Sequence, residues 1–291
     1  MTVIPDNFLG LPPKLSDLAT ARYVVLPVPY EGTVSYETGT SEGPRAIITA
    51  SQQVEHFDEE LGREFTKAGV ATLPPVLPAV TPAEEMKRIR AAAGPIIESG
   101  QFLLTLGGEH SIVAPIVELV QKKHGPVSVL QVDAHADLRE SFRGTPYSHG
   151  SVMRRVLETT GRLCQVGIRS YSAEEAAQCP EQAAKFITPQ IIREDPKWID
   201  RALSLLSEKV YVTIDIDGLD PAVAPGTGTP EPDGLSWHEL TSLLRRVCAE
   251  RQVVSADIVE VRPIPPNHVT QYLAARLGAK LIAYTQDHFP Q

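Results

Sequence analysis

Short hydrophobic segments recur along the chain, and most of them are almost continuously apolar. Six of them are RYVVLPV from Arg22, QFLLTLG from Gln101, VSVLQVDA from Val127, LCQVGIR from Leu163, KVYVTIDID from Lys209 and VVSADIVEV from Val253. Continuous rather than alternating apolarity is typical of strands that are buried on both faces of a parallel sheet. The pattern therefore predicts six strands of such a sheet.

Stretches with the pattern of helices lie between several of these strands. AEEMKRIRAAAGPIIES precedes Gln101, IVAPIVELVQKKH follows Ser111, and a third stretch covers residues 237–250. Ser236, followed three residues later by Glu239, forms a capping box, in which each side chain bonds a free amide at the start of a helix. The repeated order of strand and helix predicts an α/β fold with helices on both faces of a mostly parallel sheet.

A segment with prolines at positions 74, 75, 78 and 82 is predicted to be a surface connection, because each proline removes a backbone donor and fixes its own φ. It could link two domains, but the alternation of strands and helices continues across it without a change in composition. A chain of 291 residues also fits one large α/β domain. We therefore expect residues 1–291 to form a single domain.

Charge and cysteine content narrow the class of protein. The 27 Lys and Arg against 36 Asp and Glu give a net charge of -9, which argues against nucleic acid as a partner because phosphate contacts need clustered positive charge. Three cysteines far apart in sequence favour a reducing compartment over a disulfide framework. The first residues, MTVIPDNFLG, do not have the pattern of an export signal, and no apolar run is long enough to span a membrane. We expect a cytoplasmic protein without membrane association.

Acidic and histidine side chains gather where predicted strands end. They are Asp133, His135 and Asp137 in DAHAD, Asp215 and Asp217 in DID, and His110 in GGEH. In an extended chain, positions i, i+2 and i+4 point the same way, so the DAHAD side chains are expected to converge. In open parallel sheets the carboxyl ends of the strands are where ligands bind. The sequence therefore predicts a site at this edge.

Four carboxylates at the ends of buried strands would repel one another unless cations neutralise them. A single Asp would be interpreted more simply as a helix cap or a solvated loop acid. Charge balance favours two divalent ions: four carboxylates contribute -4, two ions +4, and a bridging hydroxide leaves -1. Oxygen-rich ligation favours manganese over zinc, whose sites tend toward nitrogen and sulfur. We expect two Mn²⁺ per subunit, which would lower the pKa of a shared water toward neutrality.

These motifs resemble those of the ureohydrolases, the family of arginase and agmatinase. Similar segments cover most of the chain, including VLPVPYEGTVSYETGTSEGPRAI, GGEH, DAHADLRESFRGTPYSHGSVMRRVLE, VTIDIDGLDPAVAPGTGTPEPDGLSW and ADIVEVRP. The stretches SYETGTSEGPRAI, YSHGSVMRR and APGTGTPEPDGLS resemble the agmatinase branch rather than true arginases. The resemblance implies a three-layer αβα fold with a central, mostly parallel sheet. It also implies a homo-oligomer, either a trimer or a hexamer.

The resemblance further implies a role for each site residue. One manganese would be held by His110, Asp133, Asp137 and Asp215, and the other by Asp133, His135, Asp215 and Asp217, with Asp133 and Asp215 bridging. Glu260, in DIVEV, would bind the guanidinium, Asp137 would pass a proton to the departing nitrogen, and His149, in YSHGS, would relay a proton. Judged without the resemblance, His149 would be an incidental loop residue. Glu260 could instead cap a helix or pair with Arg262, but its position at the carboxyl end of a predicted strand favours a functional role.

The predicted substrate is agmatine or a related guanidino compound, hydrolysed to urea and an amine such as putrescine. The motifs do not separate agmatine from aminopropylagmatine, guanidinobutyrate, guanidinopropionate or arginine. Glu140 and Glu231 are candidates for binding an amine tail, although solvated surface charge is the simpler interpretation. A formiminoglutamate hydrolase, in which Arg139 and Arg143 would bind carboxylates, is an alternative. A non-catalytic relative is disfavoured because no expected ligand is missing.

Overall fold

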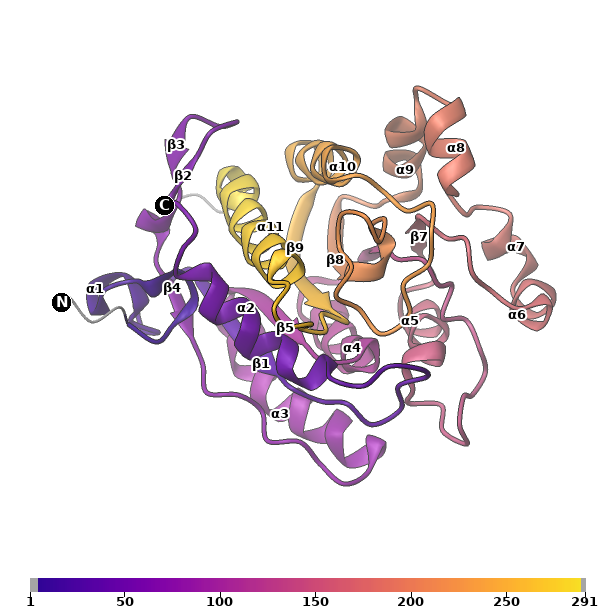
Figure 1. Cartoon of the computed structure of the whole chain (residues 1–291), viewed down its shortest axis with the longest axis horizontal. Coiled ribbons are helices and arrows are strands. Elements are labelled where there is room, and N and C mark those ends of the chain that lie inside the picture. Colours follow the sequence, from indigo (N-terminus) through magenta and orange to yellow (C-terminus); the bar gives the residue numbers. More distant parts are fainter. Residues whose placement is uncertain (1–4, 289–291) are drawn as a thin grey trace.

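The computed structural model describes residues 5–288, which contain a seven-stranded sheet and a two-stranded ribbon (Figure 1). The outermost residues of the predicted 1–291 domain lie outside the described part. The strands are β1 (Tyr23–Val28), β2 (Phe57–Asp58), β3 (Arg63–Glu64), β4 (Val70–Thr72), β5 (Phe102–Gly107), β6 (Ser128–Val132), β7 (Leu163–Val166), β8 (Lys209–Asp215) and β9 (Gln252–Val259). The helices are α1 (Pro13–Ser16), α2 (Gly43–Ser51), α3 (Pro82–Ser99), α4 (Val113–His124), α5 (Val152–Thr160), α6 (Ala173–Gln178), α7 (Pro180–Ala183), α8 (Pro189–Glu194), α9 (Trp198–Leu205), α10 (Trp237–Glu250) and α11 (Val269–Thr285).

The seven strands pair in the order β4-β1-β5-β9-β8-β6-β7, and each neighbouring pair is parallel. All six predicted strands are therefore confirmed, as is the parallel sheet. The edge strand β4 was not predicted, because three residues are too few to form a recognisable pattern. The last strand of the chain, β9, lies near the middle of the sheet between β5 and β8.

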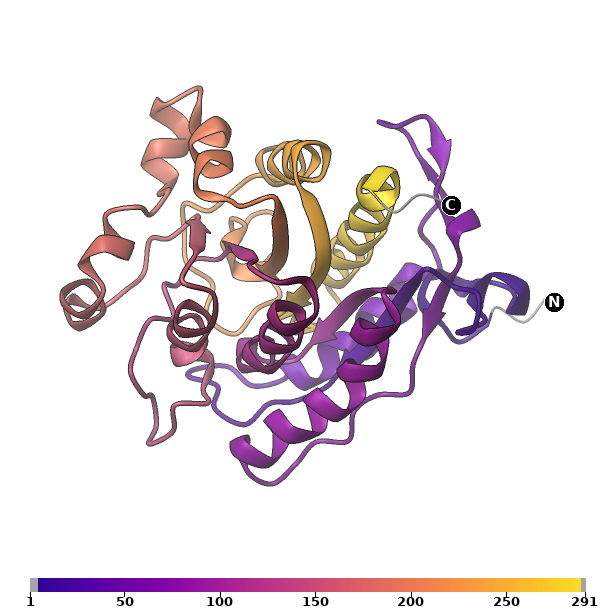
Figure 2. The ribbon, with the colours of Figure 1, turned by 180° about the vertical axis from the view of Figure 1, so that it is seen from behind.

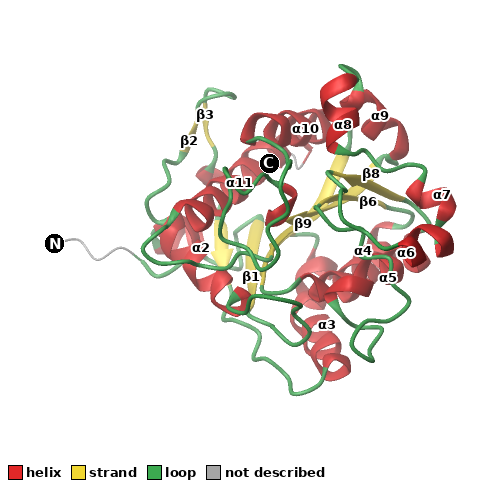
Figure 3. Ribbon diagram, turned by 45° about the vertical axis from the view of Figure 1, so that its right-hand side comes forward, coloured by secondary structure: helices red, strands yellow, loops and turns green. Residues whose placement is uncertain are grey.

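Helices cover both faces of the sheet, as the views from opposite sides show (Figures 1 and 2). Val24 and Leu26 of β1 pack in one hydrophobic cluster with side chains of α3, α4 and α5. Tyr23 and Val25 of the same strand pack in a second cluster with side chains of α2, α9, α10 and α11. Alternate residues thus face opposite helical layers, which explains why the strands are apolar throughout. The predicted three-layer αβα fold is confirmed (Figure 3).

The three predicted helices are α3, α4 and α10. At the start of α10, Glu239 N donates to Ser236 Oγ and Ser236 N donates to Glu239 Oε2, at 3.2 and 2.7 Å, so the predicted capping box forms. The proline-rich segment is an irregular connection that leads into α3, whose first residue is Pro82. No helix in the described part of the chain is long and apolar enough to cross a membrane.

Candidate active site

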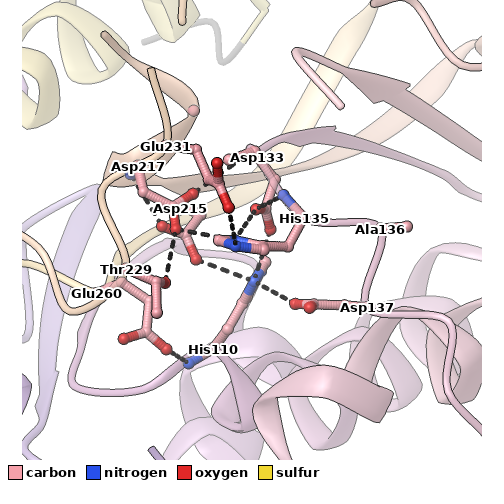
Figure 4. Close-up of polar contacts among 12 residues, drawn as sticks. His110, Asp133, His135, Ala136, Asp137, Asp215, Asp217, Thr229, Glu231 and Glu260 are labelled. Atoms are coloured by element: carbon pink, nitrogen blue, oxygen red, sulfur yellow. Dashed lines mark hydrogen bonds and ion pairs between the residues drawn. The ribbon is translucent and has the colours of Figure 1, made fainter. Parts of the chain in front are cut away.

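The predicted site residues meet at the carboxyl ends of four neighbouring strands, β5, β9, β8 and β6 (Figure 4). His110 follows β5, and Glu260 comes directly after β9. Asp215 is the last residue of β8, and Asp133 comes directly after β6. Neighbouring strands lie about 4.8 Å apart, so residues widely separated in sequence become close in space.

The segment 133–137 forms a loop, so the prediction that it continues the strand in extended form is wrong. Asp137 has a left-handed backbone conformation with φ of 54°. The loop is held by backbone bonds: Ala134 O accepts from Ser170 N at 2.9 Å, and Asp137 O accepts from Met153 N at 3.0 Å. The acidic and histidine side chains still converge as predicted, but the bend of this loop brings them together, rather than the alternation of a strand.

The imidazole of His110 is surrounded by carboxylates. Its Nδ1 lies 3.1 Å from Asp133 Oδ2, 3.2 Å from Asp137 Oδ2 and 3.4 Å from Asp215 Oδ2. The ring is buried, yet Nδ1 makes no hydrogen bond to any of these oxygens. Three acceptor oxygens around one nitrogen without a hydrogen bond are an arrangement that a shared cation would satisfy.

The other ring nitrogen of His110, Nε2, donates a hydrogen bond to Thr213. Nε2 lies 2.9 Å from Thr213 Oγ1, and the Thr213 hydroxyl donates to Asp257 Oδ1 at 2.7 Å. Because the one hydroxyl proton goes to Asp257, Nε2 must donate to Thr213. Despite its burial, the Asp133, Asp137 and Asp215 carboxylates raise the pKa of His110 well above its ordinary value, so they favour positive charge at Nδ1, which a bound cation would supply in place of a proton.

A second group of ligand atoms adjoins the first. His135 Nδ1 lies 3.0 Å from Asp217 Oδ2 and 3.6 Å from Asp133 Oδ1. Two sets of side chains can therefore each hold a metal ion: His110, Asp133 and Asp137, and Asp133, His135 and Asp217. Asp133 belongs to both sets, with one oxygen toward each histidine. The geometry accommodates two ions that share this carboxylate.

The electrostatics of the cluster also favour bound cations. Burial, together with the nearby Asp133 carboxylate, raises the pKa of Asp137 to about 7. Burial and the Asp217 and Asp133 carboxylates raise the pKa of Asp215 well above its ordinary value. Burial and mutual repulsion thus disfavour the ionised form of these two carboxyls, and divalent ions bound among them would displace their protons.

A cavity of about 270 Å³ opens beside the cluster. Its lining includes the site residues His135, Asp137, His149, Asp215, Asp217 and Glu260, together with Ser35, Tyr36, Glu37, Phe142, Tyr171 and Thr229. This volume suits a small molecule whose reacting end lies against the acidic cluster. The predicted metal ligands and the predicted substrate-binding residues therefore border one space.

Glu260 is joined to the metal-ligand cluster through the backbone. Its Oε1 accepts a hydrogen bond from His110 N at 2.7 Å, and its own backbone is left-handed, with φ of 61°. Burial, followed by the Glu109 carboxylate, raises the pKa of Glu260 well above its ordinary value. Arg262 pairs with Glu37 at 2.9 Å rather than with Glu260, so among the described residues Glu260 has no Lys or Arg partner and is suited to binding a guanidinium.

His149 lies on the wall of the cavity, at the start of the short helical turn before α5. Its Nδ1 is 3.0 Å from Thr33 Oγ1, and its Nε2 is 2.8 Å from Ser35 Oγ. The edge of the ring packs against Phe142 at 5.2 Å between centroids. Burial lowers the pKa of His149 to about 4, so the ring is neutral near pH 7.

The residues suggested for the substrate tail lie in different places. Glu140 pairs with Arg155 at 3.2 Å and is not among the described residues that line the cavity. Glu231 lies 3.9 Å from His135 Nε2, at the edge of the cluster.

Arg139 lines the cavity, but its guanidinium lies 3.6 Å from Glu175 and is therefore not free to bind a substrate carboxylate. This pairing weakens the case for a formiminoglutamate-type substrate.

Several supporting residues were not predicted, and Arg169 is the most connected of them. Its guanidinium donates to the backbone carbonyls of Asp217 and Glu231 at 2.7 Å and of Pro232 at 2.8 Å. It thereby ties the two ends of the connection between β8 and α10, which carries both Asp217 and Glu231, to the segment after β7. No local pattern reveals this role, because its partners are distant in sequence. Asp257, in contrast, could have been noticed as an acid inside an apolar strand.

Comparison with known proteins agrees with this geometry. The model of the arginase family matches residues 21–283. An N(1)-aminopropylagmatine ureohydrolase of Synechocystis sp. is 37% identical over 96% of both chains, and an agmatinase of Bacillus anthracis is 34% identical over 84% of both. The crystal structure of agmatine ureohydrolase of Thermoplasma volcanium superposes with a TM-score of 0.84 at 32% identity, covering 93% of this chain and 92% of that chain.

A match of this extent confirms the resemblance that the motifs indicated. The region matched by the family model includes every strand of the central sheet and all the segments that carry the predicted ligands. The chain therefore belongs to the arginase family of ureohydrolase enzymes.

Proposed function

We propose that this chain is a binuclear manganese ureohydrolase that cleaves the guanidinium C–N bond of a guanidino compound with a cationic tail, releasing urea and an amine. The observation that carries the proposal is that His110 Nδ1 is buried 3.1–3.4 Å from three carboxylate oxygens without a hydrogen bond, beside a cavity that Glu260 lines. A metal cluster explains the carboxylates around His110, and a guanidinium fits the cavity beside Glu260.

The donor set fits two hard divalent ions. His110, Asp133, Asp137 and Asp215 would hold one ion, and Asp133, His135, Asp215 and Asp217 the other. Carboxylate oxygens outnumber imidazole nitrogens, which favours manganese over zinc. When bound, such a pair supplies Lewis-acid activation of a water molecule as nucleophile.

The protein's own side chains would orient the substrate and move protons. A guanidinium is planar and cationic, so the Glu260 carboxylate can hold its nitrogens and fix the central carbon beside the cluster. Asp137, whose side chain both touches His110 and lines the cavity, is placed to accept a proton and pass it to the departing nitrogen. His149, neutral and at the cavity wall, would relay a proton to the leaving amine.

We place N(1)-aminopropylagmatine first among substrates and agmatine second. The relative that carries the first name aligns over 96% of this chain, compared with 84% for the agmatinase from Bacillus anthracis. Glu231 lies at the edge of the cluster and is the acidic group best placed for a tail amine, because the other acid, Glu37 of the cavity lining, pairs with Arg262 at 2.9 Å. Assembly into trimers or hexamers, location in the cytoplasm, and the absence of nucleic-acid partners remain predictions.

A urea-release assay tests the proposal. After manganese loading, the enzyme would be given N(1)-aminopropylagmatine, agmatine, arginine, guanidinobutyrate and guanidinopropionate, and the same preparation stripped of metal would serve as the control. We expect kcat/KM for the two substrates with cationic tails to exceed that for the guanidino acids by at least about tenfold, since charge-assisted contacts contribute roughly 1.5–3 kcal/mol each. Absence of urea from every compound would reject the proposed reaction.

A further inference from the structure

Glu109, the acidic residue of the GGEH motif, is a fully buried carboxylate that is not among the described residues lining the cavity. Its Oε2 accepts backbone hydrogen bonds from Gly32 at 2.7 Å and Thr33 at 2.6 Å. Its Oε1 accepts from the hydroxyls of Thr33 at 2.8 Å and Ser111 at 2.5 Å. Four donors occupy the lone pairs of this carboxylate and fix its position.

The Thr33 hydroxyl has one proton, and that proton points at Glu109. Thr33 Oγ1 can therefore only accept further hydrogen bonds. It is approached by two nitrogens of one residue: His149 N at 3.2 Å and His149 Nδ1 at 3.0 Å. The backbone nitrogen is always a donor, and Nδ1 must be a donor as well. The ring of His149 is therefore protonated on Nδ1.

The second ring nitrogen, Nε2, is then unprotonated. It accepts from Ser35 Oγ at 2.8 Å, and both Ser35 and His149 line the cavity. Phe142 packs edge-on against the ring at an interplanar angle of 78°, which opposes a rotation that would exchange the two nitrogens. A basic nitrogen therefore borders the space that the substrate would occupy.

We propose that Glu109, acting through Thr33, is a positioning residue that keeps His149 protonated on Nδ1 and leaves its unprotonated Nε2, hydrogen-bonded to Ser35, at the cavity wall. The inference rests on the proposed function for its catalytic consequence, because His149 is useful as a base only if substrate binds there. The tautomer itself is a property of the protein alone and can be measured without substrate.

The arrangement has a counterpart behind His110. There Asp257 takes the hydroxyl proton of Thr213, and Thr213 accepts from Nε2 of the histidine. In both cases a buried carboxylate determines the direction of a threonine hydroxyl, and the hydroxyl determines which ring nitrogen donates to it. The donor is Nε2 in His110 and Nδ1 in His149, so opposite nitrogens of the two rings face the site.

The test uses the full-length, metal-free protein labelled with ¹⁵N in histidine, because imidazole nitrogens with and without a proton differ in chemical shift. The His149→Asn spectrum identifies the His149 signals. We expect a protonated Nδ1 in the wild type and loss of that single tautomer in Thr33→Val. With manganese restored, Thr33→Val should lose at least about tenfold in kcat, as expected when a positioned base is disturbed, with metal content and KM within about twofold.

Thr33→Ser keeps the hydroxyl and should rescue both the tautomer and most of the lost kcat, whereas Glu109→Gln should mix the tautomers. If Glu109→Gln does not fold, the comparison of Thr33→Val with Thr33→Ser still shows whether the Thr33 hydroxyl sets the tautomer of His149. A wild-type ring protonated on Nε2, or a Thr33→Val ring that keeps its proton on Nδ1, overturns the inference. If the tautomers behave as expected but no guanidino compound yields urea, the positioning role stands and the proposed reaction fails.

Discussion

His110 Nδ1 and Asp133 Oδ2 lie 3.1 Å apart without forming a hydrogen bond, and each is fixed from its far side. Thr213 holds the imidazole at Nε2. Asp133 Oδ2 accepts from Gln131 Nε2, and Asp133 Oδ1 accepts from His135 N, both at 2.6 Å. The two ligand atoms are thus positioned by protein contacts before an ion arrives, which reduces the reorganisation needed for metal binding.

Replacing Thr213 with Val should weaken manganese binding about 10–100-fold, the usual cost of removing the hydrogen-bond partner of a ligating histidine. Without the hydroxyl, the His110 proton is free to move to Nδ1, where it blocks the metal. Thr213→Ser is the matched control and should bind manganese nearly as well as the wild type. Titration calorimetry measures the affinities, and equal affinities for the Val and Ser variants would contradict the tautomer assignment.

Removing Asp133 should affect both ions, whereas removing Asp217 should affect one, because Asp133 belongs to both ligand sets and Asp217 to a single set. We expect Asp133→Ala to lose both ions and its activity, and Asp217→Ala to keep one ion. Asp215→Ala should also lose metal and activity if it bridges as proposed. Elemental analysis and urea release measure the two properties together. Glu140→Ala, which alters an exposed carboxylate away from the cavity, should retain two ions.

If Asp133→Ala kept two ions and full activity, the assignment of Asp133 as the shared ligand would be wrong. Loss of both ions in Asp217→Ala would instead show that the two metals bind only as a pair.

Glu260→Gln should retain its metal but lose at least about tenfold in kcat/KM, because a neutral amide replaces a charge-assisted contact with the guanidinium. The amide oxygen can still accept from His110 N, so the local backbone should be preserved. Steady-state kinetics with the best substrate, alongside metal analysis, provide the measurement. Unchanged kinetics would reject the guanidinium-binding role.

Arg169→Met should destabilise the protein by roughly 2–4 kcal/mol, because it leaves several backbone carbonyls without their donor. Arg169→Lys should be intermediate, since an ammonium cannot reach all of these carbonyls at once. Denaturant unfolding measures the free-energy change. We also expect KM to rise, because the part of the β8–α10 connection that carries Glu231 loses its anchor to Arg169. A fully stable Met variant would disprove this structural role.

The sequence was informative where the signal is local. Six strands and the clustered ligands were predictable because continuous apolarity and the acids that follow it lie within a few residues of each other. The contacts of Thr33 with His149 and of Arg169 with Glu231 were not, because they join segments far apart in the chain. Glu140 was suggested by its proximity to DAHAD, but its side chain pairs with Arg154 and Arg155 of α5 instead.

The central position of β9 has a consequence for biosynthesis. This strand emerges from the ribosome after every other strand of the sheet, yet it supplies Asp257 and is followed directly by Glu260. A nascent or C-terminally shortened polypeptide therefore has a gap between β5 and β8, and the His110 and Asp215 ligands on either side of that gap are not held together. We therefore expect manganese to bind only after β9 has been synthesised and has joined the sheet, and fragments ending before β9 should accumulate without metal.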